Sequence, residues 1–384
     1  MNDPVELTAR LVACPSVTPA DAGAQKVLEK ALSASGAKLT PLTFEAPGTD
    51  PVRNLFARVG VGRPHFAFAG HTDVVPTGDD ASWDHPPFSG AIADGRVYGR
   101  GATDMKGGVA CFAAALNRFV ERHGTPPGTI SMIITGDEEG PAINGTLPLM
   151  EWLREEDLIP DHCLVGEPTN PDHPGQMIKI GRRGSLSGHI EVQGTQGHVA
   201  YPDRVDNPAH RLVRLLSALT EQPWDDGSEH FQPTSIQVTT IDIGNPALNV
   251  VPEKARASFN LRFSDQYSGE TLEAEIRSRL AAADAEANYR LQLNCSAESF
   301  LSPPSDFSET VAHAVEAATG RRPVYGTTGG TSDARFIRLF CPVAEYGAVG
   351  KTMHQVNEHA EIAHLTQLSD IYLDILERYF GLTS

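Results

Sequence analysis

The first 180 residues alternate between short apolar runs and segments whose apolar residues recur at helical spacing. The runs, rich in β-branched and aromatic residues, predict strands at 54–59, 66–74, 129–135 and 162–166. A long amphipathic helix is expected to follow Gly108 and to end at Gly124. Strands that alternate with helices in this way are typical of an α/β layer around a largely parallel sheet.

The rhythm changes between residues 181 and 295. There the pattern predicts strand, helix, strand, strand, helix and strand, at 187–193, 208–219, 235–243, 255–263, 270–283 and 289–294. That order matches a ferredoxin-like α+β sandwich. The α/β pattern then returns, with a strand at 343–346 and helices at 309–319, 332–339 and 362–380. We therefore predict one domain made of 1–180 and 296–384, with a second domain, 181–295, inserted into it.

The chain is strongly acidic. Its 384 residues include 31 Lys and Arg and 49 Asp and Glu, a formal net charge of −18. The electrostatic field of so negative a chain repels nucleic acid and anionic membranes, so we expect neither as a partner. An anionic substrate would need a local basic pocket. The start lacks the features of a secretory signal and no apolar run approaches the ~20 residues of a membrane span, so a cytoplasmic location is expected. The five cysteines form no Cys-x-x-Cys pair, which predicts neither a disulfide framework nor a thiolate zinc site.

The first candidate site residues lie at the end of the predicted strand 66–74, where His71 and Asp73 stand two positions apart. Positions i and i+2 of an extended chain share a face, so the two side chains should point the same way. Asp73 is then placed to accept a hydrogen bond from the far ring nitrogen of a metal-bound His71 and to fix its tautomer. By itself, such a pair is more often structural than metal-binding.

Carboxylates also stand next to glycines further along the chain. A glycine-rich turn presents Asp104 just before the long helix, where one carboxylate can offer its oxygens to two metal ions. An apolar strand delivers Glu138 and Glu139, which project in opposite directions and therefore suit two jobs, metal binding and proton transfer. Each segment also has a purely structural interpretation. Asp104 can be a helix cap, and the two glutamates can belong to a solvated acidic turn.

Glu167 and His354 complete the set, each at a predicted strand end or loop. Any one of these segments can be structural. Together they supply two imidazoles and several carboxylates, the mix of nitrogen and oxygen donors that is typical of a catalytic zinc pair.

With these residues, the chain resembles the succinyl-diaminopimelate desuccinylases, within the dinuclear-zinc group of aminoacylases, acetylornithine deacetylases and glutamate-releasing carboxypeptidases. The likeness runs from the first helix to the last, inserted domain included, and rests on the metal-site segments as a set. It implies hydrolysis of N-succinyl-LL-2,6-diaminopimelate to LL-2,6-diaminopimelate and succinate, in lysine and peptidoglycan precursor biosynthesis. It also implies two Zn²⁺ per subunit, for which Co²⁺ can substitute, and a homodimer paired through the inserted domain. The donors alone leave the native ion open, since zinc, cobalt and manganese accept similar ligands.

The resemblance gives each candidate ligand a place. His71 and Glu167 are implied as the terminal ligands of one zinc. Glu139 and His354 are implied as those of the other, with Asp104 bridging the two.

The resemblance also implies the residues that handle protons and charge. Glu138 corresponds to the general base and acid, and Asp73 to the partner that orients the first imidazole. A cis peptide bond is implied between Asp104 and Met105. His198 is implied to reach in from the inserted domain and stabilise the oxyanion, in its own or a partner's active site, so that catalysis requires domain closure.

Segments in or beside the inserted domain resemble the substrate side of the desuccinylases. The residues implied to contact substrate are Arg182, Tyr201, Asn249, Arg262, Gly330 and Thr331. The two arginines are expected to hold substrate carboxylates through forked hydrogen bonds, although a lone arginine is more often a solvated surface group. The chain departs from some relatives just before His354, where Gly350-Lys351 replaces an expected asparagine.

Two other readings stay open from the sequence. Another amidohydrolase of the group, such as an acetylornithine deacetylase, differs only in its acyl and amine pockets. A metal-binding protein without catalysis would act through its dimer surface, but Glu138 beside Glu139 counts against it because such a protein needs no base. The chain lacks a complete dinucleotide fingerprint and a Gly-x-Ser-x-Gly elbow, which argues against nucleotide-binding and serine hydrolase readings.

Overall fold

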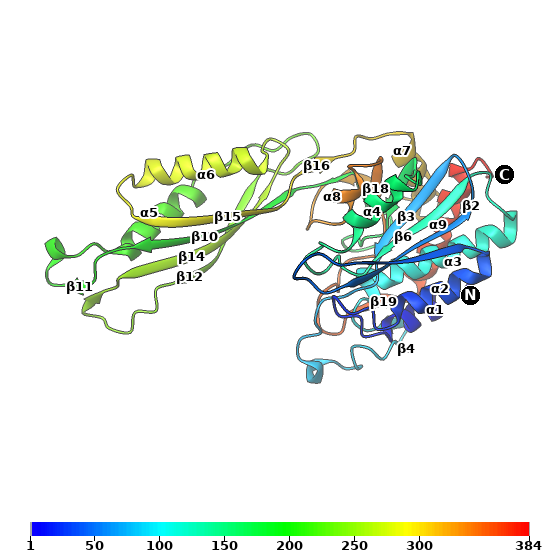
Figure 1. The fold of residues 1–384 in the computed structure, drawn as a ribbon, viewed down its shortest axis with the longest axis horizontal. Helices are drawn as coiled ribbons and strands as arrows, with labels where there is room; N and C mark the ends of the chain where they lie inside the picture. The colour runs from blue at the N-terminus through cyan, green and yellow to red at the C-terminus, as the bar shows by residue number, and fades with distance from the viewer. Residues whose placement is uncertain (1, 384) are drawn as a thin grey trace. The chain divides into compact units, whose positions relative to one another are not determined.

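A computed structural model describes residues 2–383. The chain forms two compact units (Figure 1). Unit 1 runs up to Ile180 and also includes Ser302–Gly326 and the stretch from Ser332 onward. Unit 2 consists of Gly181–Leu301 and Thr327–Thr331. Each unit has its own sheet and helices.

Unit 1 is built on an eight-stranded mixed sheet with the strand order β1-β2-β6-β3-β7-β18-β8-β17. The strands are β1 (Lys38–Phe44), β2 (Val52–Gly60), β3 (His65–His71), β6 (Thr129–Thr135), β7 (His162–Val165), β8 (Met177–Lys179), β17 (Val324–Gly326) and β18 (Val343–Glu345). Strands β6, β3, β7 and β18 are neighbours and run parallel. All residues of β3 and β6 are buried. This parallel, buried centre confirms the α/β layer that the apolar runs predict.

Helices cover both faces of this sheet (Figure 1). They are α1 (Pro4–Val12), α2 (Ala24–Leu32), α3 (Gly107–His123), α4 (Thr146–Glu155), α7 (Asp306–Thr319), α8 (Ala334–Ile337) and α9 (Ile362–Tyr379). On one face, Phe68 of β3 stacks on Phe112 of α3 with ring centroids 4.3 Å apart. Because Ala57 lies on the same face as Phe68, its neighbour Phe56 lies on the other, where it contacts Trp152 of α4. None of the described helices has the length and apolar character needed to cross a bilayer.

A small three-stranded sheet joins two segments that are distant in sequence. It has the order β19-β5-β4 and contains β4 (Ala91–Ala93), β5 (Arg96–Tyr98) and β19 (His359–Glu361). Two residues after Tyr98 the chain reaches Arg100, and the irregular turn η3 (Ala102–Lys106) then leads into α3. The Asp104–Met105 peptide bond in this turn is cis, as expected. The small sheet thus places the glycine-rich turn beside the segment that follows His354.

Unit 2 is a four-stranded antiparallel sheet with two helices on one face (Figure 1). Its elements are β10 (Gly184–Gln193), α5 (Pro208–Thr220), β12 (Ser235–Asp242), β14 (Lys254–Phe263), α6 (Gly269–Ala283) and β15 (Tyr289–Ala297). Leu186, Phe259, Leu215 and Ile276 belong to the apolar core between the helices and the sheet. The strand order β12-β14-β10-β15 and the order of elements along the chain match the expected ferredoxin-like sandwich.

Shorter elements complete the two units. In unit 2 these are the pairs β9 (Gly181–Arg182) with β16 (Phe300–Leu301) and β11 (Gly197–His198) with β13 (Val250–Val251), and the turn η4 (Pro202–Arg204). In unit 1 they are η1 (Ser33–Ser35) and η2 (Asp80–Ser82).

Two predicted elements extend several residues beyond the elements of the structure. The strand predicted at 66–74 ends at His71, because Val74 forms a bridge with Val17 instead of extending the sheet ladder. The helix predicted at 332–339 is reduced to α8 (Ala334–Ile337). Its expected first residue is engaged elsewhere, since the Ser332 hydroxyl donates a hydrogen bond to Glu345.

Replacing Phe112 by alanine tests the aromatic packing under the sheet. The ring is fully buried between Phe68, Phe66 and Tyr372, so its removal leaves a cavity and is expected to lower the free energy of unfolding by about 3–5 kcal/mol. Urea unfolding followed by circular dichroism measures the change. Val61→Ala is the control, since that side chain is 75% exposed and its loss should change the free energy by less than about 0.5 kcal/mol. Equal effects of the two substitutions would contradict this packing.

Candidate metal centre

Adjacent parallel strands deliver five of the candidate side chains to one edge of the sheet. His71 is the last residue of β3, Glu138 and Glu139 follow β6, and Glu167 follows β7. His354 lies in the loop after β18, the next strand in the order. The carboxyl ends of parallel strands meet at one edge, which is where open α/β sheets bind ligands. The convergence therefore follows directly from the strand order.

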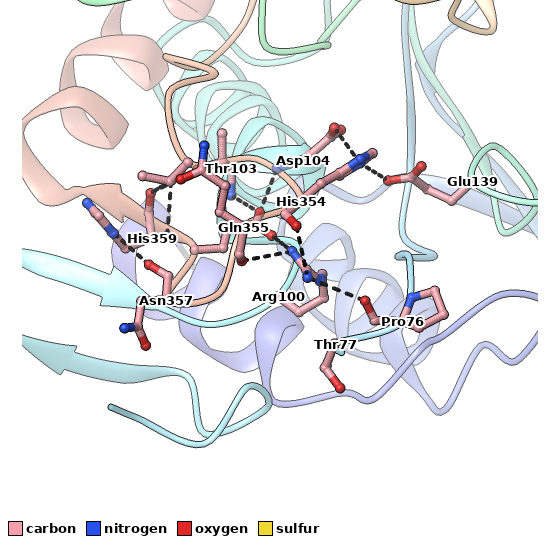
Figure 2. A network of polar contacts seen from close by, with 12 residues as sticks. Pro76, Thr77, Arg100, Thr103, Asp104, Glu139, His354, Gln355, Asn357 and His359 are labelled. Carbon is pink, nitrogen blue, oxygen red and sulfur yellow. Dashed lines mark hydrogen bonds and ion pairs between the residues drawn. The ribbon is translucent and has the colours of Figure 1, made fainter. Parts of the chain in front are cut away.

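Asp104, from the turn η3, lies between the two imidazoles. Its Oδ1 is 3.3 Å from Nε2 of His71. Figure 2 shows its other contact, in which Oδ2 is 3.3 Å from Nε2 of His354. The Nε2 atom of His71 also lies 3.5 Å from Glu167 Oε1, and that of His354 lies 2.9 Å from Glu139 Oε1. Two groups thus share Asp104, and within each group the potential ligand atoms lie within 4.8 Å of one another. The structure brings together all five residues that the sequence proposes as metal ligands.

The donor atoms of these groups fit divalent cations. Nε2 of His71 and Oδ1 of Asp104 are buried and have no hydrogen-bond partner within residues 2–383. Buried polar atoms are normally paired, so two unpaired atoms that face each other suit a shared cation. Imidazole nitrogen and carboxylate oxygen are the donors of catalytic zinc sites.

The orientation of His71 differs from the prediction in one respect. Its Nδ1 lies 2.9 Å from the backbone carbonyl oxygen of Asp73, whereas the Asp73 carboxylate is 3.6 Å away. A carbonyl oxygen only accepts, so Nδ1 carries the ring proton and Nε2 is left to bind a cation. The strand ends at His71, so the extended i, i+2 geometry does not continue, and in this structure the Asp73 carboxylate approaches Nδ1 only to 3.6 Å. The Asp73 carboxylate instead accepts hydrogen bonds from the backbone N–H groups of Glu138 (3.3 Å) and Glu139 (3.0 Å).

The metal-free site favours protonated imidazoles. Burial by itself lowers the pKa of His71, but the contacts with Asp104 and Glu167 outweigh burial and raise this pKa well above its usual value. The contacts with Asp104 and Glu139 raise the pKa of His354 to about 10. Burial acts to raise the pKa of Asp104, but the two imidazoles outweigh it and lower that pKa. The site therefore holds protons where cations would bind.

Glu138 differs from the candidate ligands in its surroundings. Its Oε2 lies 4.0 Å from Nε2 of His71, farther than the Asp104 or Glu167 oxygens. Burial and then the charge of Glu167 raise the pKa of Glu138 well above its usual value. Burial likewise raises the pKa of Asp73 to about 6. A carboxyl group with a raised pKa takes up a proton more readily, which suits a general base that later acts as an acid.

Several buried charged residues around the site received no role from the sequence, among them Asp137, Arg100 and Glu358. Asp137 accepts hydrogen bonds at 2.9 Å from the backbone N–H groups of Ile143 and Asn144 and so shapes the loop after β6. Arg100 and Glu358 form an ion pair beside the His354 loop. All three lie within four residues of a candidate ligand in the sequence, but charged loop residues are usually solvated, so nothing in the sequence indicates that they are buried.

The remaining candidates all belong to unit 2. His198 lies in β11, opposite Val250 of β13. The ring of Tyr201 meets that of His198 edge-on, with centroids 5.7 Å apart. Asn249 is close by, since its carbonyl oxygen accepts a hydrogen bond from the N–H of Val199 at 3.1 Å. His198, Tyr201 and Asn249 thus form one local group.

The two candidate arginines are partly or fully buried. Arg182 donates a hydrogen bond at 2.9 Å to the carbonyl oxygen of Gly330, the neighbour of Thr331. Arg262 lies on β14 opposite Ser185 of β10. One guanidinium nitrogen of Arg262 is buried without a hydrogen-bond partner in the described part of the chain, and burial lowers the pKa of this residue. A buried N–H donor without an acceptor suits an anionic ligand.

Known proteins resemble this chain over its whole length. A family model described as Peptidase family M20/M25/M40 matches residues 67–378. A curated relative from Methylorubrum extorquens strain PA1, named succinyl-diaminopimelate desuccinylase, is 53% identical over 382 residues, 99% of both chains. A solved M20 family metallo-carboxypeptidase from Sulfolobus solfataricus has a TM-score of 0.78 at 17% identity and covers 100% of both chains. The YXEP protein of Bacillus subtilis, a dinuclear metal binding peptidase from the M20 family, has a TM-score of 0.69 at 14% identity, over 99% of this chain and 98% of that one.

The raised pKa values of the imidazoles predict that cation binding releases protons. At pH 7 His354, whose pKa is raised to about 10, carries a proton that a cation must displace, and the raised pKa of His71 acts in the same direction. The apparent affinity should therefore rise as the pH rises toward about 10 and fall as the pH is lowered. Titration calorimetry with Zn²⁺ in buffers of different ionisation enthalpy counts the protons released. An affinity that does not change between pH 6 and pH 8 would contradict this coupling.

Proposed function

The chain belongs to peptidase family M20/M25/M40, and on this premise we propose how its residues carry out the reaction. It is a metal-dependent hydrolase of amide bonds. Its reaction is the hydrolysis of N-succinyl-LL-2,6-diaminopimelate to LL-2,6-diaminopimelate and succinate, in lysine and diaminopimelate biosynthesis. The observation that carries this conclusion is the 53% identity to a desuccinylase over 99% of both chains.

Two zinc ions are proposed to occupy the two groups that share Asp104. His71 and Glu167 would hold one ion, and Glu139 and His354 the other. The short distances between these donors and the unpaired atoms of His71 and Asp104 support the assignment. Co²⁺ can replace Zn²⁺ because it accepts the same nitrogen and oxygen donors. When bound, two such metal ions lower the pKa of a water molecule and polarise the amide carbonyl.

Glu138 is proposed as the general base and acid. It takes a proton from the attacking water, whose oxygen forms the new bond to the succinyl carbonyl carbon. It then returns the proton to the nitrogen as the carbon–nitrogen bond breaks, which yields succinate and the free amine. Its raised pKa supports this shuttle, because the protonated form is stable enough to persist between the two steps.

Asp73 is proposed to position Glu138 and Glu139. Its carboxylate accepts hydrogen bonds from both backbone N–H groups, and its own backbone carbonyl orients His71. One residue thus fixes the base and a ligand from each ion group.

His198 is proposed to stabilise the oxyanion, in its own active site or in that of a partner subunit. The N–H of Ala200 donates a hydrogen bond to Nδ1 of His198 at 3.1 Å. In the neutral ring the proton then resides on Nε2, which is left as a donor. A donor aimed at developing negative charge lowers the barrier of amide hydrolysis.

The substrate is a small anionic N-acyl amino acid, and basic groups of unit 2 are proposed to hold its carboxylates. Arg182 and Arg262 are the forked donors, and the unpaired guanidinium nitrogen of Arg262 supports this role. The further proposed contacts are Tyr201, Asn249, Gly330 and Thr331. These basic groups supply the local attraction that a chain of net charge −18 otherwise lacks.

A cytoplasmic homodimer is proposed, paired through unit 2. Strand β12 lies at the edge of its sheet, and Ile241 on this strand is 59% exposed. An open strand edge with exposed apolar side chains is suited to pairing with a second copy about a two-fold axis.

Glu138→Gln tests the proposed base. Glutamine keeps the size of the side chain but cannot accept the proton, so kcat should fall by about 10²–10⁴-fold while two equivalents of zinc remain bound. Steady-state kinetics and metal analysis of the same sample measure both. Glu155→Gln, on the exposed end of α4, should leave both unchanged. A Glu138→Gln enzyme with near-normal kcat would remove this residue from the mechanism.

Side-by-side assays test the substrate against the nearest alternative, an acetylornithine deacetylase. Acetylornithine lacks the distal carboxylate of the succinyl group, so buried donors such as Arg262 stay unpaired when it binds. We expect kcat/KM to favour succinyl-diaminopimelate by at least about 10²-fold. A preference for acetylornithine would overturn the assignment of the acyl group.

A further inference from the structure

Arg100 and Glu358 form an ion pair that is almost completely buried. Nη1 of Arg100 donates to Oε2 of Glu358 at 2.7 Å, and the side chains are 3% and 0% exposed. The small sheet brings them together, because β5 and β19 pair His359 with Tyr98 and the N–H of Gly99 then donates to the carbonyl oxygen of Glu358 at 2.8 Å. A buried ion pair costs desolvation unless further hydrogen bonds satisfy both groups. Those further bonds lead to the proposed metal ligands.

The second oxygen of Glu358 holds the turn that carries Asp104. Oε1 accepts a hydrogen bond from the N–H of Thr103 at 3.0 Å and from the N–H of Asp104 at 3.2 Å. The hydroxyl of Thr103 also donates to the carbonyl oxygen of His359 at 2.8 Å. The residue shared by the two ion groups is therefore fixed through its main chain by a carboxylate from the opposite end of the sequence.

The guanidinium of Arg100 holds the loop that carries His354. Nη2 donates to the carbonyl oxygens of His354 (3.4 Å) and Pro76 (3.3 Å), and Nη1 also donates to that of Gln355 at 3.2 Å (Figure 2). His354 and Asn357 both have a φ of 62°, a left-handed conformation that is unfavourable for residues with a side chain. The left-handed residues add to the cost of the path that the loop takes, and the two hydrogen bonds from Arg100 to the carbonyl oxygens of His354 and Gln355 help to offset that cost.

We propose that the Arg100–Glu358 pair is a positioning device for the ion held by His354, Glu139 and Asp104, an inference that rests on the metal sites of the proposed function. His71 is fixed by the sheet, since it ends the fully buried strand β3. His354 has no such support and depends on the loop. The Arg100–Glu358 pair joins this loop to the turn of Asp104. Loss of the pair should therefore weaken binding of the metal ion at His354 far more than binding of the metal ion at His71.

Two substitutions test the pair by different routes. Glu358→Gln keeps an oxygen that can accept from the Thr103 and Asp104 amides but removes the charge that holds Arg100. Arg100→Lys keeps the charge but loses the planar fork that reaches the His354 carbonyl. Substitution of a group that supports a metal ligand typically lowers metal affinity by about 10–100-fold. We therefore expect either substitution to weaken the binding of one of the two metal ions by that factor.

The measurement is a Co²⁺ titration of the apo-protein, followed by visible absorption and calorimetry. A His354→Ala chain identifies the equivalent that belongs to the His71 group, because it keeps only that one. In Glu358→Gln and Arg100→Lys, the dissociation constant of Co²⁺ at the His71 group should stay within about threefold of its wild-type value. The dissociation constant of the other Co²⁺ should rise.

Glu361→Gln is the matched control. Glu361 lies in β19 and its carboxylate accepts a hydrogen bond from Nε of Arg96 in β5 at 2.8 Å, so it forms an ion pair across the same two strands. That pair is 40% and 39% exposed, and neither side chain contacts a proposed ligand in the part of the chain that is described. Its loss should leave both Co²⁺ equivalents unchanged.

The outcomes separate this inference from the proposed function. If the wild-type chain binds fewer than two equivalents, the metal sites themselves are wrong. If it binds two, but Glu358→Gln and Arg100→Lys weaken neither or weaken both equally, the positioning role is overturned. The melting temperature of each apo-protein is recorded as well, and a lower value with unchanged Co²⁺ affinities would assign the pair to stability alone. Should Glu358→Gln fail to fold, Arg100→Lys decides by the same criteria.

Discussion

Carboxylates crowd one edge of the unit 1 sheet, and the rest of the site depends on that crowding. Asp104, Glu138, Glu139 and Glu167 meet there around the imidazoles of His71 and His354, and these carboxylates are largely shielded from water. Negative charges so placed repel one another unless protons or cations compensate them. The parallel order of β6, β3 and β7 brings these charges together, and the two proposed zinc ions relieve their repulsion. Metal binding and the stability of this region are therefore expected to be linked.

The fold was largely predictable where the pattern was long or complete. Strand β6 has the bounds predicted, and α3 ends at the glycine expected to stop it, because a buried strand and a five-turn helix each leave an unambiguous pattern. Helices α1 and α2 were not predicted, although both are amphipathic. Each has nine residues, and a helix of that length is stabilised mainly by packing against other elements, which the local sequence does not reveal.

The site was predictable for a related reason. The proposed ligands stand at strand ends or next to glycines, and the structure brings all of them together. What the sequence did not predict are contacts set by the path of the chain. The carboxylate of Asp73 turns toward two amides because the strand has already ended, and Arg100 meets a partner 258 residues away across the small sheet. Such contacts exist only after the tertiary structure has formed.

The hydrogen bond that orients His71 is made by the main-chain carbonyl oxygen of residue 73. Every amino acid carries that group, so no exchange of the side chain at this position removes it. The tautomer of the imidazole is therefore protected against point mutation in a way that a carboxylate partner would not allow. A substitution at residue 73 can therefore leave Nδ1 as the nitrogen bonded to the main chain and Nε2 as the nitrogen that faces the site, provided that the chain leaves the strand at the same place.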